Sequence, residues 1–174
     1  MDANKQAART GMMRSAYRSK DYASAITAAD EVTAQRGVSA ELKREAAYIK
    51  AKSSLASSKR EQALALFRQL SAEPSTAIGA EAEYMVIQDL YDTGKFASVD
   101  DEVYSFSQKA GGQSYWLPRA YIVLGDAFAE RGQYAQAQAT FESIRDGYEP
   151  ESGTDDISDS VRMRLERLST LMQE

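Results

Sequence analysis

In the last third of the chain, the apolar positions recur at helical spacing on two successive segments. Leu124 and Phe128 lie four residues apart, so they share one face of a first helix. Phe141 and Ile144 lie three residues apart and face back onto it from a second helix. Between the segments, Gly132 can form a tight turn without a Cβ penalty. The pattern therefore predicts a helix–turn–helix pair.

Two small residues lie where such a pair would cross. Gly125 stands next to the apolar stripe of the first helix, and Ala137 stands near the start of the second. We expect Gly125 to let the second helix approach closely and Ala137 to mark the closest crossing. An ordinary helical hairpin in a bundle predicts one such pair, so recurrence of the pattern decides between a bundle and a repeat.

The pattern recurs along the whole chain. The small residue that begins each second helix is found at Ala25, Ala63, Val99 and Ala137, at nearly equal intervals. Four units with a period of about 37 residues predict a repeat architecture. We place the repeats at about 5–38, 39–75, 76–112 and 113–150. Trp116 is expected to join the fourth repeat to the third.

The sequence predicts nine helices and no strands, all in a single domain spanning residues 1–174. The expected ranges are 3–18, 22–35, 39–57, 60–73, 76–92, 96–109, 114–130, 134–147 and 155–173.

The last predicted helix, 155–173, has no partner helix. Its apolar stripe consists of Ile157, Val161, Leu165, Leu168 and Met172. Asp155 and Asp156 come at its start, where acidic side chains favour the helix dipole. Because a solenoid must cover its last apolar face, we interpret this helix as a cap. The acidic loop 146–156 before it lacks the ligand pattern of a calcium-binding EF-hand, so it is expected to be solvated.

The fourth repeat resembles a tetratricopeptide (TPR) unit in the spacing of Tyr121, Leu124, Gly125, Phe128, Ala137 and Phe141. Tyr121 stands where the family has Trp, and Pro150 comes one residue late. The first three repeats depart further, with Ala29 in the place of Phe141 and Ile87 in the place of Gly125. The resemblance implies an all-α, TPR-type solenoid, a right-handed superhelix with a C-terminal capping helix. It also implies a protein–protein interaction scaffold.

In the TPR family, the second, fifth, ninth, twelfth and thirteenth positions of each unit line a concave groove. Carried over, the resemblance implies groove residues Thr10, Arg14, Tyr17 and Arg18; Glu45, Tyr48, Lys52 and Leu55; Glu81, Tyr84, Gln88, Tyr91 and Asp92; and Arg119, Ile122, Asp126 and Glu130. The candidate partner-binding residues are Arg14, Tyr17, Arg18, Tyr48, Lys52, Tyr84, Gln88, Tyr91 and Arg119.

Tyrosines on such a face suit recognition of a partner protein or an extended peptide, because each adds apolar area and a hydroxyl. The alternative is that Tyr48 and Tyr84 pack between repeats. The carboxylate clamp of chaperone-binding TPR domains is not matched, because Thr10 and Arg14 stand where Lys and Asn would. Binding to a chaperone's acidic tail is therefore not expected.

Composition argues against catalysis. The chain contains no His and no Cys, so neither a Ser-His-Asp triad nor a Cys-His pair can be assembled. It also lacks the Gly-rich phosphate loop with Lys and Ser or Thr. We expect no enzyme, no cofactor and no metal site.

Charge is unevenly distributed. Residues 1–75 hold 13 Lys and Arg against 8 Asp and Glu, whereas residues 76–174 hold 8 against 18. Opposite charges could orient a partner or favour head-to-tail association. The overall net charge of −5 argues against nucleic acid as a partner.

The run Tyr115-Trp116-Leu117, with Gln133-Tyr134-Ala135 and the terminal helix, resembles the C-terminal ends of long bacterial TPR proteins of the cell envelope. The resemblance implies the end of a larger array on the periplasmic side, with a cytoplasmic location as the alternative. The chain has no apolar run that could insert into a membrane, and its first residues have no signal-peptide pattern. The alternative function is a structural self-assembly module, which an uncovered Met12-Met13 face at the N-terminal end would favour.

Overall fold

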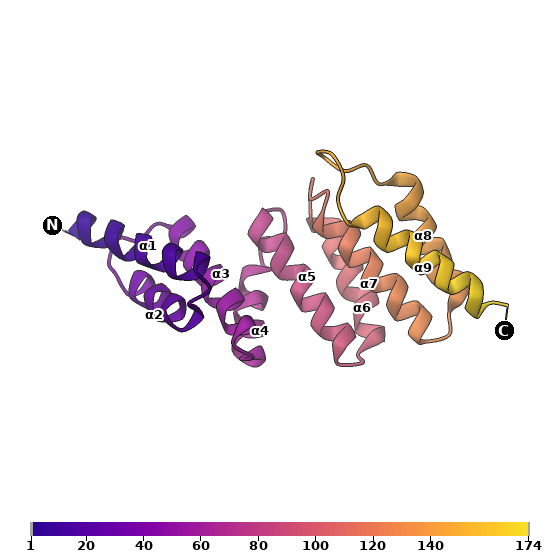
Figure 1. The fold of residues 1–174 in the computed structure, drawn as a ribbon, viewed down its shortest axis with the longest axis horizontal. Helices are drawn as coiled ribbons and strands as arrows, with labels where there is room; N and C mark the ends of the chain where they lie inside the picture. The colour runs from indigo at the N-terminus through magenta and orange to yellow at the C-terminus, as the bar shows by residue number, and fades with distance from the viewer. Residues whose placement is uncertain (1, 174) are drawn as a thin grey trace. The chain divides into compact units, whose positions relative to one another are not determined.

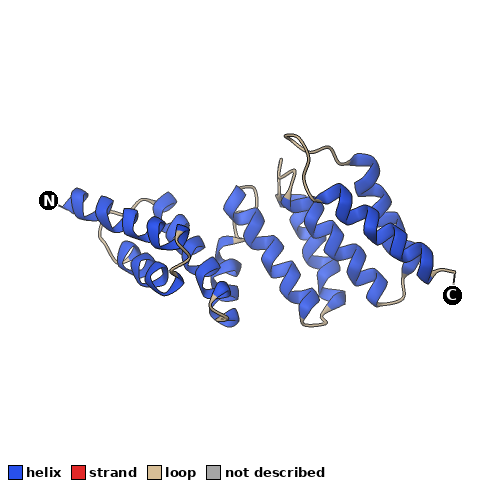
Figure 2. Ribbon diagram, in the orientation of Figure 1, coloured by secondary structure: helices blue, strands red, loops and turns tan. Residues whose placement is uncertain are grey.

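The computed structural model describes residues 2–173 and shows helices and no strands over that range (Figures 1 and 2). The helices are α1 (Asp2–Arg18), α2 (Tyr22–Thr33), α3 (Ala40–Ala56), α4 (Arg60–Leu70), α5 (Ala77–Asp92), α6 (Phe96–Lys109), α7 (Trp116–Glu130), α8 (Tyr134–Gly147) and α9 (Ile157–Leu171). The predicted all-α class is confirmed for this range.

The chain divides into two compact units, an N-terminal unit of residues 1–73 and a C-terminal unit of residues 74–174. In the N-terminal unit α1 packs on α2, α2 on α3 and α3 on α4, and α1 also contacts α3. In the C-terminal unit each helix from α5 to α9 packs on the next, while α5 also contacts α7 and α7 also contacts α9. This order, consecutive helices in contact and alternate helices side by side, is that of an all-α repeat fold.

The turn inside each predicted repeat has the same backbone geometry in all four. A residue with positive φ is followed by a backbone N–H that bonds the carbonyl five residues earlier, as in a Schellman turn. The residues with positive φ are Lys20, Ser58, Gly94 and Gly132, with φ values of 61°, 60°, 72° and 71°. The hydrogen bonds are Asp21 N to Ala16 O at 2.9 Å, Lys59 N to Ser54 O at 2.8 Å, Lys95 N to Leu90 O at 2.8 Å, and Gln133 N to Phe128 O at 2.9 Å. The sequence period is therefore also a structural period.

The small residue near the start of each second helix is buried. The four small residues Ala25, Ala63, Val99 and Ala137 are at most 1% exposed. A Cβ atom built on Gly125 would lie 2.6 Å from Cζ of Phe141, closer than real Cβ contacts come. Gly125 therefore lets the Phe141 ring pack directly against the backbone of α7, as the sequence predicts.

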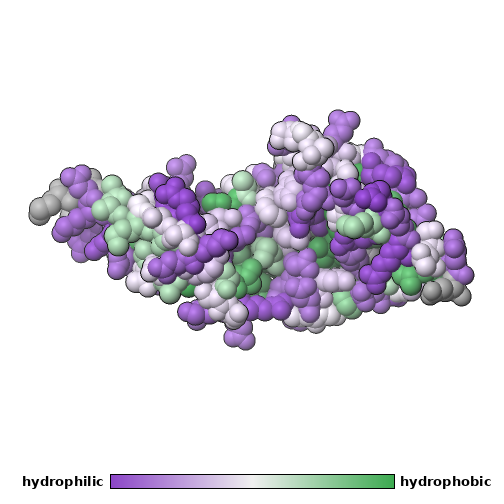
Figure 3. Space-filling view, in the orientation of Figure 1, coloured by the Kyte–Doolittle hydropathy of each residue, from purple (hydrophilic) through white to green (hydrophobic). Residues whose placement is uncertain are grey.

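Most of the buried apolar residues form three clusters. One lies in the N-terminal unit around Met13, Val32 and Ile49. A second joins α5, α6 and α7, and Trp116 packs against it with its ring 5.4 Å from that of Tyr84. Trp116 thus joins the fourth repeat to the third, as predicted. The face seen in Figure 3 is mostly hydrophilic, with hydrophobic side chains in small separate groups.

The third cluster joins α7, α8 and α9 and contains the predicted cap. Ile157, Val161 and Leu168 of α9 are buried in it, and Leu165 packs against it. Met172 is 51% exposed, so its placement in the apolar stripe is wrong. Met172 is the C-cap of α9, one residue beyond its last residue Leu171, and lies outside the buried cluster.

Candidate functional site

A cavity of about 670 Å³ lies within the C-terminal unit and is lined by α5, α7 and α9, with two residues from α8. Figure 1 shows these three helices following one another on the near side of that unit. Its apolar lining includes Ile122, Val123, Phe141 and Leu168, and its polar lining includes tyrosine, arginine and carboxylate side chains. The cavity has the size of a typical ligand site.

Many lining residues occupy equivalent positions in successive repeats, and this spacing continues into α9. They form three rows in which each member lies one repeat after the last, namely Tyr84, Ile122 and Ser160; Gln88, Asp126 and Arg164; and Tyr91, Ala129 and Arg167. The helix interpreted as a cap therefore contributes to the site in the same way as the first helices of the third and fourth repeats. Sequence reasoning missed Ser160, Arg164 and Arg167, although one further repeat step from the fourth repeat would have found them.

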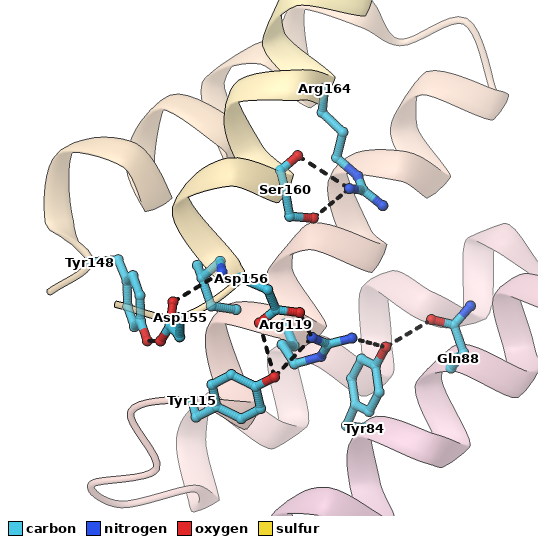
Figure 4. Close-up of polar contacts among 10 residues, drawn as sticks. Tyr84, Gln88, Tyr115, Arg119, Tyr148, Asp155, Asp156, Ser160 and Arg164 are labelled. Carbon is cyan, nitrogen blue, oxygen red and sulfur yellow. Dashed lines mark hydrogen bonds and ion pairs between the residues drawn. The ribbon is translucent and has the colours of Figure 1, made fainter. Parts of the chain in front are cut away.

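Arg119 is the centre of a hydrogen-bond network that joins α5, α7 and the segment before α9 (Figure 4). Its Nη1 donates to Asp156 Oδ2 at 2.5 Å and to the Tyr115 hydroxyl at 3.0 Å, and its Nη2 donates to the Tyr84 hydroxyl at 3.3 Å. The guanidinium also lies 5.1 Å from the Tyr84 ring centre and 5.5 Å from that of Tyr115. These contacts fix the side chain in one orientation.

Asp156 is held by two donors. The Tyr115 hydroxyl donates to Oδ1 at 3.0 Å while Arg119 donates to Oδ2. Burial alone would raise the pKa of Asp156, but these hydrogen bonds outweigh it and hold the pKa below its ordinary value. The carboxylate therefore stays ionised and keeps Arg119 in place.

Tyr84 and Gln88 extend the network along α5. The Tyr84 hydroxyl donates to Gln88 Oε1 at 3.2 Å, and Gln88 Nε2 donates to Asp92 Oδ1 at 2.9 Å (Figure 4). The Tyr84 hydroxyl thus accepts from Arg119 and donates to Gln88. Its ring packs on the core cluster, so this tyrosine both packs between repeats and lines the cavity.

Arg164 of α9 is fully engaged with its neighbours. Its Nε donates to Asp126 Oδ1 at 2.7 Å and its Nη2 donates to Asp126 Oδ2 at 2.7 Å. Its Nη1 donates to Ser160 Oγ at 2.6 Å and to the Ser160 carbonyl oxygen at 3.2 Å (Figure 4). This two-pronged ion pair ties α9 to α7 across the cavity.

Tyr91 presents its hydroxyl to a carboxylate. The hydroxyl donates to Glu130 Oε1 at 3.3 Å. Burial, followed by the charges of Asp126 and Glu130, raises the pKa of Tyr91, so the phenol remains a hydrogen-bond donor. The predicted site residues Tyr84, Gln88, Tyr91 and Arg119 therefore meet at one cavity.

The other five predicted site residues lie in the N-terminal unit. Arg14 donates to both carboxylate oxygens of Glu45, at 2.6 and 2.7 Å, which links α1 to α3. Tyr17 and Tyr48 pack against the core of that unit, and the Lys52 ammonium lies 5.8 Å from the Tyr48 ring centre. Arg18 is exposed at the end of α1. That these five residues bind a partner stays a prediction.

Two further observations concern the described part of the chain. Residues 2–173 contain no group of three or more acidic side chains placed to hold a metal ion. None of the helices described combines the length and the apolar character needed to cross a bilayer.

Comparisons with protein-family models, with curated proteins and with solved structures each give no match to this chain. Function is therefore inferred from the repeat geometry and from the cavity.

Proposed function

We propose that this protein is an interaction scaffold of the TPR type that binds a partner protein or an extended peptide on the face formed by α5, α7 and α9. The observation that carries the proposal is the cavity of about 670 Å³, which is lined at equivalent repeat positions by the alternate helices α5, α7 and α9. A row of equivalent positions on parallel helices suits an extended segment, which presents side chains at regular intervals.

The TPR assignment is supported by the repeated local geometry. The four Schellman turns and the four buried small residues recur with the period seen in the sequence. The positions of Tyr121, Leu124, Gly125 and Phe128 fit the family pattern of the first helix.

The polar side chains of the cavity are prearranged for binding. Arg119, Arg164 and Tyr91 are each held by hydrogen bonds from within the unit, so little side-chain freedom remains to be lost when a partner binds. Tyrosine adds rigid apolar area beside these groups.

The experiment is a selection of random dodecapeptides displayed on phage against the full chain, followed by affinity measurement. Tyr91→Ala should weaken binding of the selected peptides by roughly 1–4 kcal/mol, the range for an aromatic anchor. Tyr104→Ala is the matched control, because Tyr104 is 69% exposed on α6 and outside the cavity. Equal binding by both variants, or no selected peptide, would contradict the proposal.

The alternative, a self-assembly module, has one supporting observation. Met12 is 63% exposed on α1, whereas Met13 is fully buried in the core. One methionine rather than a two-residue face is therefore uncovered. Light scattering of the wild type and of Met12→Ser over a range of concentrations tests this alternative, which requires an association that the substitution weakens.

A further inference from the structure

We propose that the cavity binds an isolated acidic side chain of the partner segment, held by Arg167, with apolar neighbours of that residue on the apolar lining. This inference rests on the proposed function and names the chemistry of the peptide.

The arginines of the C-terminal unit gather at the cavity. Residues 74–174 hold 8 Lys and Arg against 18 Asp and Glu, a net charge of −10. Three of the six arginines of this unit, Arg119, Arg164 and Arg167, line the cavity. The two lysines lie at the two ends of α6. The carboxylates Asp126 and Glu130 also line the cavity, so its lining carries three positive and two negative side chains, in a unit that is acidic as a whole.

Five of these six arginines have carboxylate partners. Arg119 and Arg164 bind Asp156 and Asp126 as described, and Arg131 donates to both oxygens of Asp100 at 2.7 and 3.0 Å. The remaining two, Arg145 and Arg162, pair with acidic residues near them in sequence.

Arg167 differs from the other five. Among the described residues its guanidinium has no hydrogen-bond or ion-pair partner, and the side chain is exposed at the cavity. Its neighbours Leu168 and Leu171 also line the cavity. A guanidinium binds a carboxylate through two parallel hydrogen bonds, so Arg167 offers a complete site for one.

The repeat register leaves room beside Arg167. In the row of Tyr91, Ala129 and Arg167, the middle position is occupied by the smallest side chain of the three. An acidic side chain bound to Arg167 would therefore have space over Ala129 of α7, while the Glu130 carboxylate beside it accepts the hydrogen bond of the Tyr91 hydroxyl. Met163 adds flexible apolar surface for the residues next to the acid.

The negative net charge of the C-terminal unit limits which partners can bind to it. A polyanion such as nucleic acid or a run of acidic residues is repelled by the net charge of −10. A single carboxylate in direct contact with one guanidinium gains the short-range interaction, while the more distant charges are screened by salt. The inferred recognition element is thus one Asp or Glu flanked by apolar residues.

The test compares dodecapeptides selected on phage by the wild-type full chain and by its Arg167→Gln and Arg162→Gln variants. Arg162 is the matched control, because it lies on the same helix and pairs with Asp159 and Glu166 away from the cavity. We expect wild type and Arg162→Gln to enrich one Asp or Glu between apolar residues. The Arg167→Gln chain should lose that enrichment.

A double-mutant cycle sharpens the test. Changing the peptide acid to its amide should weaken binding at least about 10-fold in wild type and leave binding to Arg167→Gln nearly unchanged. Selected peptides without an enriched acid, or an equal loss in both proteins, would overturn this inference while leaving the proposed function standing. Failure to select any peptide would overturn both.

Discussion

At the scale of single residues, the four repeats fill the same space with different side chains. The position of Gly125 is occupied in the earlier repeats by Met13, Ala51 and Ile87, and the position of Phe141 is occupied by Ala29, Phe67 and Val103 in the same order. All eight residues are buried. Gly or Ala at the first position is paired with Phe at the second, Met is paired with Ala, and Ile is paired with Val. The two side chains of a pair therefore divide the space between the helices in different ways. This compensation accounts for the departures of the first and third repeats from the family pattern at these two positions, while their backbone turns agree with that of the fourth.

The Gly125–Phe141 pair gives the first prediction. Gly125→Ala should destabilise the protein by about 1–3 kcal/mol, because the added Cβ would overlap the buried Phe141 ring. Urea unfolding measures the loss. Gly147→Ala is the control, since that glycine also lies in a helix and a Cβ there would meet no atom within 4 Å. Equal stability of the two variants would show that the close approach is absent.

The Arg14–Glu45 pair gives a pH-dependent prediction. The hydrogen bond from Arg14 outweighs burial and holds the pKa of Glu45 below its ordinary value of 4.5. Because folding lowers this pKa, the stabilisation is complete above about pH 4.5 and is lost as the pH falls through the folded-state pKa. Glu45→Gln should therefore lower stability at pH 6 and have less effect at pH 3.

Urea midpoints at both pH values measure this difference. Glu41→Gln serves as the control, because Glu41 lies on the same helix, is exposed, and has no ion pair among the described residues. If Glu45→Gln and Glu41→Gln behave alike at both pH values, Arg14 does not stabilise the ionised Glu45.

At the scale of helices, the sequence predicted best where strong turn signals flank an element. The helices 96–109 and 134–147 are found with those bounds, because Gly94 and Gly132 end the preceding turn in each case. The predicted 60–73 helix ends at Leu70, and the predicted 114–130 helix begins at Trp116. The nearest turn signals in the sequence, Pro74 and Gly112, lie four residues away from these ends, so they do not fix them.

The helix register also accounts for which residues of the cavity were predicted from the sequence and which were missed. Register within the repeat was enough to bring Tyr84, Gln88, Tyr91 and Arg119 to one cavity. Treating α9 as a cap hid its contribution to the cavity. The pairing of each arginine could not be predicted, because it depends on side-chain positions across repeats.

Helix α9 gives the third prediction. Removing residues 155–174 should lower the melting temperature and cause association, because Ile122, Phe141 and Ile144 lose their cover. The three buried side chains of α9 contribute roughly 1.5–3 kcal/mol each by burial. Removing residues 172–174 is the control, since α9 ends at Leu171. Calorimetry and light scattering measure the effect, and a monomeric 1–154 chain with unchanged melting temperature would contradict it.

At the scale of the whole molecule, the chain consists of two units with opposite net charge, and the same helical repeat period is found in both. The N-terminal unit holds 13 Lys and Arg against 8 Asp and Glu, and the C-terminal unit holds 8 against 18. The period of the sequence pattern predicted the all-α fold class of both units, because this period depends only on local spacing along the chain. Only the C-terminal unit shows the predicted candidates gathered at the cavity of α5, α7 and α9. This gathering is the reason for proposing this face as the partner-binding face.

The most direct test of that claim is a methyl NMR titration of the full chain with a peptide selected by the wild type. Ile122, Met163 and Leu171 line the cavity, whereas Met12 and Leu55 lie in the N-terminal unit and Leu117 lines a separate groove of the C-terminal unit. We predict that the methyl signals of the first three residues shift together and saturate at one peptide per chain. Shifts confined to Met12, Leu55 or Leu117, with the cavity methyl groups unchanged, would contradict the assignment.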